Sequence, residues 1–166
     1  MTEKPTALTV IPANIPEALK GLPQWVCWKY AWKEGKEDKP GKWTKPPFEP
    51  NGNFAKSTDS KTYSEFGEAL AAYQEEESGF DGIGFVLTPI DPFVGIDIDH
   101  CFVDGIVTDE AQGIINELDS YTERSPSGAG IRIFVTGTIP KAVKKDQIEM
   151  YAQGRYVTVT GQKWPL

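Results

Sequence analysis

The sequence predicts an α+β fold with a largely antiparallel sheet. Short runs of β-branched and aromatic residues recur along the chain with turn residues between them, as is typical of strands. Two longer segments, one after Asp59 and one after Thr108, carry apolar residues at helical spacing instead. Runs of strands interrupted by a few helices favour antiparallel pairing. The 166 residues, 39% of them hydrophobic, suffice for one core, so we expect a single domain.

Proline, glycine and charged residues divide the first half of the chain into two helices and two strands. The strand segments are rich in tryptophan, and a charged turn at residues 34–38 connects them. The second helix carries a single apolar stripe, because its apolar residues recur every three or four positions. The predicted elements are a helix at 14–20, strands at 25–32 and 42–44, an extended loop at 45–52 and a helix from about 59 to 77.

The second half is predicted to contain six strands and one helix. The turn at 89–92 separates two apolar runs, so residues 82–87 and 93–100 are predicted to pair as a hairpin. A helix is predicted to begin at a cap provided by Thr108 or Asp109 and to run to Asp119. The remaining strands are predicted at 121–124, 131–135, 147–151 and 156–160.

The charge distribution limits how the protein can meet nucleic acid. The net charge of −7 argues against a protein that coats nucleic acid by bulk electrostatics, although binding in one groove stays possible. Six lysines are concentrated between Lys29 and Lys45, interleaved with Trp32 and Trp43. Such lysines are most often simply solvated, but neighbouring aromatic faces can stack bases.

Composition also excludes some classes of site and location. One histidine and two distant cysteines, Cys27 and Cys101, do not match a structural zinc site, so no zinc is expected. Unpaired cysteines fit a reducing compartment, and we expect a cytoplasmic protein. No run of residues is long and apolar enough to span a membrane, so no membrane partner is expected.

The segment Val94–His100 carries two carboxylates two positions apart. In a strand, Asp97 and Asp99 would point to one face, while Ile96 and Ile98 would point to the other face and into a core. Two carboxylates held this close repel one another unless a positive charge lies between them, and a divalent metal is the usual solution. A solvent-exposed strand end with two ordinary acids is the alternative explanation.

A loop of small residues at 125–130 precedes the strand that carries Arg132. Ser127 and Gly128 lie in this loop, where successive backbone N–H groups could cradle a phosphate. The guanidinium of Arg132 matches the geometry of a phosphate group. A tight turn between two strands explains the loop equally well, and the ending required of a P-loop is missing.

Two further charged residues lie near the predicted C-terminal strands. Glu149 lies between apolar residues of a strand and, if that strand neighbours the one with Asp97, completes a cluster of three carboxylates. Such a cluster suits two divalent ions that act on a phosphoryl group. Arg155 stands at the start of the last strand, where it could hold phosphates. An exposed strand glutamate and a surface arginine are the alternative readings.

The order of these segments resembles the archaeo-eukaryotic primase superfamily, in particular the primase-polymerase domains of phages and plasmids. Asp97 and Asp99 match the family's Asp-x-Asp strand, and Glu149 matches its strand with an acid after an apolar residue. Residues 130–132 fall at the family's second motif, which usually ends in histidine, whereas this chain has Arg132. The stretch 42–47 and the helix containing residues 69–73 are also similar to phage-type domains.

The resemblance implies a fold, a reaction and a set of ligands. The fold would be an N-terminal α/β unit, about residues 1–80, packed on a catalytic module like the RNA-recognition motif, about residues 81–166. Asp97, Asp99 and Glu149 would hold two Mg²⁺ or Mn²⁺ ions for template-directed nucleotidyl transfer. The triphosphate of a dNTP or NTP would be bound by Ser127, Gly128, Arg132, Arg155 and Lys45.

The resemblance also implies partners and a setting. Single-stranded DNA template and primer would be the macromolecular substrates, and Lys45 with the lysines before it would guide template or nucleotide. The chain would be one part of a longer phage or plasmid replication protein that includes a helical domain or a helicase. Two alternatives stay open: a catalytically idle nucleic-acid-binding module of a replication initiator, and an Asp-x-Asp metal-dependent nucleotide-sugar transferase.

Overall fold

A computed structural model describes residues 1–165 and contains three α-helices and thirteen strands among them. The helices are α1 (Glu17–Lys20), α2 (Phe66–Gln74) and α3 (Asp109–Leu118). The strands of the first half are β1 (Trp25–Trp28), β2 (Ala31–Lys33), β3 (Lys42–Thr44), β4 (Pro47–Phe48) and β5 (Gly82–Leu87). Those of the second half are β6 (Phe93–Ile98), β7 (Phe102–Val103), β8 (Ile106–Val107), β9 (Tyr121–Arg124), β10 (Ile131–Thr136), β11 (Val143–Lys145), β12 (Ile148–Tyr151) and β13 (Arg155–Val159).

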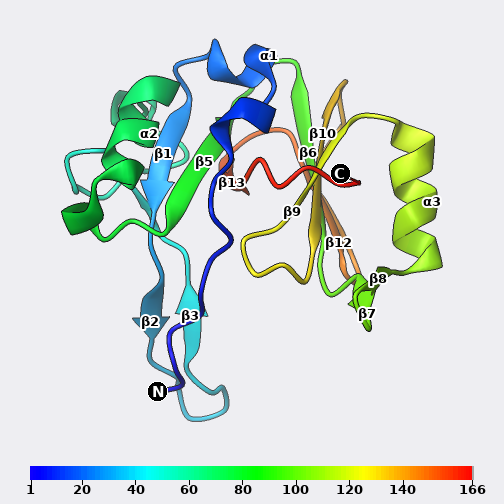
Figure 1. The fold of residues 1–166 in the computed structure, drawn as a ribbon, viewed down its shortest axis with the longest axis horizontal. Helices are drawn as coiled ribbons and strands as arrows, with labels where there is room; N and C mark the ends of the chain where they lie inside the picture. The colour runs from blue at the N-terminus through cyan, green and yellow to red at the C-terminus, as the bar shows by residue number, and fades with distance from the viewer. Residues whose placement is uncertain (166) are drawn as a thin grey trace.

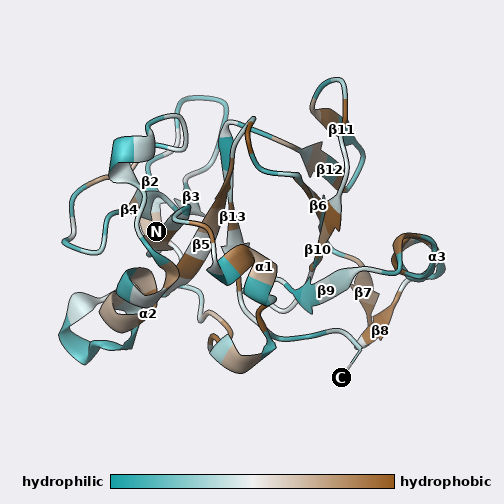
Figure 2. Ribbon diagram, turned by 90° about the horizontal axis from the view of Figure 1, so that it is seen from above, coloured by the Kyte–Doolittle hydropathy of each residue, from teal (hydrophilic) through white to brown (hydrophobic). Residues whose placement is uncertain are grey.

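Two antiparallel sheets form the body of the molecule. One has the strand order β13-β5-β1-β4, and the other has the order β11-β12-β6-β10-β9. Figure 1 shows the two sheets side by side, with α2 at one end of the molecule and α3 at the other, an arrangement that Figure 2 repeats from above. The predicted α+β class with largely antiparallel sheets is therefore confirmed. The first sheet includes β5 and β13, which come from residues after 80.

The predicted hairpin of residues 82–87 with 93–100 is wrong, because β5 and β6 belong to different sheets. Both edges of β5 are occupied, by β1 and β13, and both edges of β6 are occupied, by β10 and β12. The Asp91 carboxylate accepts hydrogen bonds from the backbone N–H groups of Thr88, at 2.7 Å, and Phe93, at 2.8 Å. These two hydrogen bonds, here called the Asp91 bracket, hold the turn in which the chain passes from β5 of one sheet to β6 of the other.

Three other elements are shorter than predicted. The strand predicted at 25–32 breaks after Trp28, since the backbone N–H of Tyr30 turns aside to donate to Asp81 at 2.7 Å. The helix predicted from 59 to 77 is only α2, flanked by single 3₁₀ turns. Ser64 pairs with Trp25 through its backbone, so the helix begins after a Glu65–Glu68 capping box. The first predicted helix begins only after Pro16, at α1.

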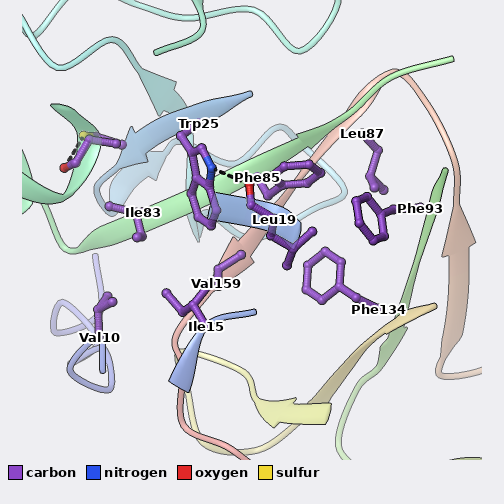
Figure 3. Close-up of a cluster of buried hydrophobic side chains, with 12 residues drawn as sticks. Val10, Ile15, Leu19, Trp25, Ile83, Phe85, Leu87, Phe93, Phe134 and Val159 are labelled. Atoms are coloured by element: carbon purple, nitrogen blue, oxygen red, sulfur yellow. Dashed lines mark hydrogen bonds between the residues drawn. The ribbon is translucent and has the colours of Figure 1, made fainter. Parts of the chain in front are cut away.

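The apolar core has two main parts. The larger part joins the first sheet to one face of the second, where the rings of Phe85, Phe93 and Phe134 pack edge to face (Figure 3). The other part fills the space between the second sheet and α3, with Ile96 and Ile98 packed near Ile115. Both cysteines are buried and unpaired with each other. None of the helices within residues 1–165 is long and apolar enough to cross a bilayer.

Candidate functional site

A row of charged residues crosses the five-stranded sheet in register. Lys144 of β11 lies opposite Glu149 of β12, which lies opposite Asp97 of β6. Asp97 in turn lies opposite Arg132 of β10, which lies opposite Glu123 of β9. Directly opposed residues share one face of a sheet, with Cβ atoms about 4.5–5.5 Å apart. The five side chains therefore form one charge row on one face, and the predicted neighbourhood of the strands bearing Asp97 and Glu149 is confirmed.

Strand alternation decides which face carries this row. Ile96 and Ile98 flank Asp97 in β6, and both are buried in the core under α3. Ile131 and Ile133 flank Arg132 in the same way and enter the same core. Asp97 and Arg132 consequently point to the opposite face, which is the face turned toward the first sheet. The prediction that the isoleucines face a core behind Asp97 is correct.

Asp97 and Arg132 form a short ion pair. The guanidinium Nη1 of Arg132 donates to Asp97 Oδ1 at 2.6 Å, and the two side chains are 10% and 21% exposed. Burial raises the pKa of Asp97; the charge of Arg132 opposes this shift, while Asp99 and Glu149 add to it. Negative charge therefore converges on Asp97, and Arg132 is the strongest counter-charge acting on it.

Glu149 is held by a second set of contacts. Its carboxylate accepts a hydrogen bond from the Tyr151 hydroxyl at 3.0 Å and pairs with Lys144 Nζ at 3.2 Å. Burial alone would raise the pKa of Glu149, but these two partners and the charge of Arg155 outweigh it and lower the pKa. Arg155 donates to the Tyr151 hydroxyl at 2.8 Å and stacks over the same ring at 4.3 Å. Glu149 is thus ionised and oriented beside Asp97.

A cavity of about 200 Å³ opens over the charge row. The neighbouring strand β13 forms one wall, and Lys45, just after β3, closes it from another side. Burial lowers the pKa of Lys45, with Arg132 adding to the effect and Asp97 and Asp99 opposing it. The residues that line the cavity are Lys45, Gly95, Ile96, Asp97, Arg132, Glu149, Tyr151, Arg155, Tyr156, Val157 and Thr158.

Two buried polar atoms of the cavity-lining residues have no hydrogen-bond partner within the described residues. They are Nε of Arg132 and Oγ1 of Thr158, whose side chains belong to different sheets. Buried polar groups are normally satisfied, so an unpaired donor beside a cavity is a place where a polar ligand would be held. Together with the cations of Lys45 and Arg155, they make this cavity suited to an anion with several oxygens.

The structure brings five of the eight predicted site residues to this cavity: Lys45, Asp97, Arg132, Glu149 and Arg155. Asp99 is not among them. It follows the end of β6 in an exposed turn and borders a separate cavity with His100 and Asp146. Within residues 1–165, no three metal-binding side chains come close enough together to hold an ion.

The loop at 125–130 lies apart from this cavity, and four of its backbone N–H groups donate to acceptors within the loop itself. Gly128 N–H donates to the carbonyl of Ser125 at 2.8 Å, and Gly130 N–H donates to the Ser125 hydroxyl at 3.0 Å. Gly128 has a φ of 75°, a left-handed conformation that glycine adopts without strain. Ser127 is exposed and accepts from Ala129 N–H at 3.3 Å. These contacts describe a tight turn, the alternative that the sequence left open.

Sequence reasoning missed Tyr151, Tyr156 and Thr158 as cavity residues. The Tyr156 hydroxyl donates to the backbone carbonyl of Lys45, which ties β13 to the segment after β3. Burial raises the pKa of Tyr156 beyond the physiological range, so this hydroxyl stays protonated. The alternation of β13 could have drawn attention to Tyr156 and Thr158, since these two polar residues share one face of the strand while Val157 and Val159 share the other.

No protein-family model matches this chain. A DNA primase-polymerase of Nitratiruptor phage NrS-1 is 38% identical over an alignment 156 residues long, and the match covers 88% of this chain and 20% of the phage protein. The chain thus spans about a fifth of the length of the relative it matches. The match confirms the resemblance predicted from the order of the motifs: this chain is homologous to part of a phage DNA primase-polymerase.

Proposed function

We propose that the cavity over the charge row binds a nucleoside triphosphate and that the chain catalyses template-directed nucleotidyl transfer. The observation that carries the proposal is the in-register row Glu149–Asp97–Arg132, which places two adjacent carboxylates beside a guanidinium on one wall of a cavity lined by further cations. The similarity to a DNA primase-polymerase supports the same reaction class. The arrangement as a primase-polymerase fold, with an N-terminal unit and an RNA-recognition-like module, is part of this proposal.

The cations divide into two groups around the proposed triphosphate. Arg132 lies beside Asp97 and has an unpaired Nε, and Lys45 faces it with a pKa lowered by burial. Arg155 stacks on Tyr151 at the exposed edge of the cavity. Guanidinium groups match the geometry of phosphate oxygens, so Arg132 and Arg155 would orient the triphosphate, with Lys45 adding charge. Ser127 and Gly128 would act only from outside this cavity.

The carboxylates fit a divalent cation by their chemistry. Asp97 and Glu149 lie directly opposite one another, an arrangement that destabilises a sheet unless a positive charge compensates it. Their oxygens are the hard donors that Mg²⁺ and Mn²⁺ prefer. We propose that Asp97 and Glu149 hold these ions, which when bound would lower the pKa of the attacking 3′-hydroxyl and stabilise the charge of the leaving pyrophosphate. Asp99, in the exposed turn after β6, would become a third ligand only by turning toward this cavity.

One observation favours a second candidate function. Arg132 neutralises Asp97 directly, at 2.6 Å, where a histidine is usual in the family that the sequence resembles. A carboxylate held in this way is already paired before any ion arrives. A catalytically idle module that binds nucleotide or single-stranded DNA would need only the cations of the cavity.

Primer extension on a primed single-stranded DNA template tests the proposal. The wild-type chain is expected to extend the primer with dNTPs or NTPs in the presence of Mg²⁺ or Mn²⁺, and EDTA is expected to stop the reaction. Asp97→Ala is expected to abolish extension. The matched control is Glu76→Ala/Glu77→Ala, which removes two exposed carboxylates from the 3₁₀ turn after α2. Circular dichroism at the assay temperature checks that each variant is folded.

The outcomes separate the candidates. Extension that survives in Asp97→Ala, or that is lost equally in the control variant, contradicts the assignment of Asp97. Absence of extension in the wild-type chain, with nucleotide still bound, favours the idle module. Metal-dependent dNTP binding measured by calorimetry then reports on the cavity independently of turnover.

A further inference from the structure

The strands β2 and β3 form a separate two-stranded ribbon that carries its own charge. Figure 1 shows this ribbon extending away from the two sheets, with its connecting loop at the edge of the molecule. Residues 29–45 contain six lysines and three acidic residues, a net charge of +3 in a chain of net charge −7. The positive charge of the protein is therefore concentrated on a projecting element.

The lysines of the ribbon are placed opposite one another. Lys33 and Lys42 are direct partners in the β2–β3 ladder, and the backbones of Lys36 and Lys39 form an isolated antiparallel β-bridge near the turn. Like charges directly opposite destabilise a strand pair. All four are exposed, and within residues 1–165 none of them forms an ion pair with a carboxylate. A bound polyanion would relieve this repulsion.

Aromatic rings run along the same ribbon. Trp32 and Trp43 are direct partners, with ring centroids 5.5 Å apart, and Tyr30 lies 6.4 Å from Trp43. Both tryptophans are half-buried, and Nε1 of Trp32 has no hydrogen-bond partner within the described residues. Aromatic faces beside lysines are the usual surface for single-stranded nucleic acid, because bases stack on the rings while cations follow the backbone.

The ribbon leads to the cavity over the charge row. Lys45 follows β3 directly, lines that cavity, and places its ammonium 5.7 Å from the centroid of the Tyr30 ring. Tyr30 therefore links the aromatic series of the ribbon to the wall of the cavity. An extended strand lying on the ribbon would enter the cavity beside Lys45.

We propose that the β2–β3 ribbon binds single-stranded DNA and directs it toward the cavity that contains Asp97. This inference rests on the proposed function, because a template-directed reaction requires a strand beside the nucleotide. The rings of Trp32 and Trp43 stack bases on one face of the ribbon, while Lys33 and Lys42, which alternate to the other face, reach the phosphates round the edge of this two-stranded element, together with Lys36 and Lys39 near its turn. The ribbon has no part in binding the triphosphate.

Fluorescence anisotropy of a labelled oligodeoxythymidine tests the ribbon. The variant Lys33→Ala/Lys36→Ala/Lys39→Ala/Lys42→Ala is expected to raise Kd by about tenfold or more. The slope of log K against log salt is expected to fall by about 3, since each lost phosphate contact of a single strand contributes about 0.7. The four-lysine control Lys56→Ala/Lys61→Ala/Lys141→Ala/Lys145→Ala removes equally exposed charges elsewhere.

The control is expected to stay within about twofold of the wild-type Kd, because its lysines make no proposed phosphate contact. Replacing the four ribbon lysines by arginine is expected to preserve DNA binding, which separates loss of charge from loss of folding. Binding of dATP with Mn²⁺, measured by calorimetry, is expected to be unchanged in all of these variants.

Two results would overturn the inference: an unchanged Kd in the ribbon variant, or equal losses in the ribbon and control variants. Failure of the proposed function has a different signature. If the ribbon is needed for DNA binding but the wild-type chain extends no primer, the ribbon assignment stands and the polymerase assignment falls. If Asp97-dependent extension persists while the ribbon variant binds DNA normally, only the ribbon assignment falls.

Discussion

Removal of Arg132 is expected to destabilise the fold more than removal of its partner Asp97. Arg132 is 10% exposed and lies in register between Asp97 and Glu123, with Glu149 one strand further away. Arg132→Met keeps most of the aliphatic volume but leaves Asp97 without its ion-pair partner and removes the positive charge opposite Glu123, while Glu149 keeps Lys144. Because Asp97 is 21% exposed, we expect a loss near the lower end of the range for breaking a buried pair, about 3 kcal/mol.

Asp97→Ala is expected to cost less, about 1–2 kcal/mol, because the ionised Glu149 stays near Arg132 as a counter-charge and loses a like-charged neighbour. The ionic hydrogen bond couples the two sites by about 1.5–3 kcal/mol. The double variant should therefore be about as stable as Arg132→Met alone. Urea unfolding at neutral pH, followed by circular dichroism, measures all four corners of the cycle.

Either of two results would refute this reasoning. If the losses of the single variants simply add in the double variant, the 2.6 Å contact contributes no net coupling. If Asp97→Ala is the more destabilising change, the remaining carboxylates of the charge row do not stabilise the charge of Arg132 as the strand register suggests.

The remaining predictions concern stability and thiol chemistry. Burial raises the pKa of Glu123, so its contribution to stability is full at low pH and is lost as pH rises. The glutamine of Glu123→Gln does not titrate. The variant should therefore be less stable than the wild type at low pH, and this difference should shrink by about 1.4 kcal/mol for each unit that pH rises between the ordinary and the raised pKa of Glu123. A difference that does not change with pH contradicts this prediction. Gly161→Ala should destabilise the protein by about 3 kcal/mol or more in urea unfolding, because the new Cβ would overlap the Ile11 carbonyl oxygen and the residue has a φ of 67°. Gly79→Ala is the control: its φ is 70°, but the space around it is open, so it should lose only about 1 kcal/mol. Burial raises the pKa of Cys27 to about 12, so native protein should resist Ellman's reagent at that thiol until it is unfolded, and rapid labelling would show that the site opens.

The candidate site was predictable where it depends on strand alternation. The run Val94–His100 indicates a strand with Ile96 and Ile98 on a buried face, and this leaves Asp97 on the other face whatever the partner strands are. Glu149 follows by the same rule, because its apolar neighbours also face the core under α3. Local periodicity carries enough information here, since burial of one face decides the direction of the other.

The sequence could not show how long each strand continues or what it pairs with. Asp99 was expected to extend the face of Asp97, but β6 ends at Ile98 and His100 adopts a φ of 50° in the following turn. The residues 82–87 and 93–98 looked like a hairpin because they are close in sequence. Their pairing was decided by distant strands and by the Asp91 bracket, which only the folded chain brings into place.

The sequence by itself determined the α+β class, the carboxylate face of β6 and the similarity to primase-polymerases, because composition, alternation and motif order are local or linear properties. Only the tertiary structure decided that Arg132 pairs with Asp97, that Lys45 and Arg155 line the same cavity, and that the loop with Ser127 and Gly128 lies outside it. These contacts depend on the register between strands that are far apart in sequence. That register is fixed only when both sheets bury their apolar faces together.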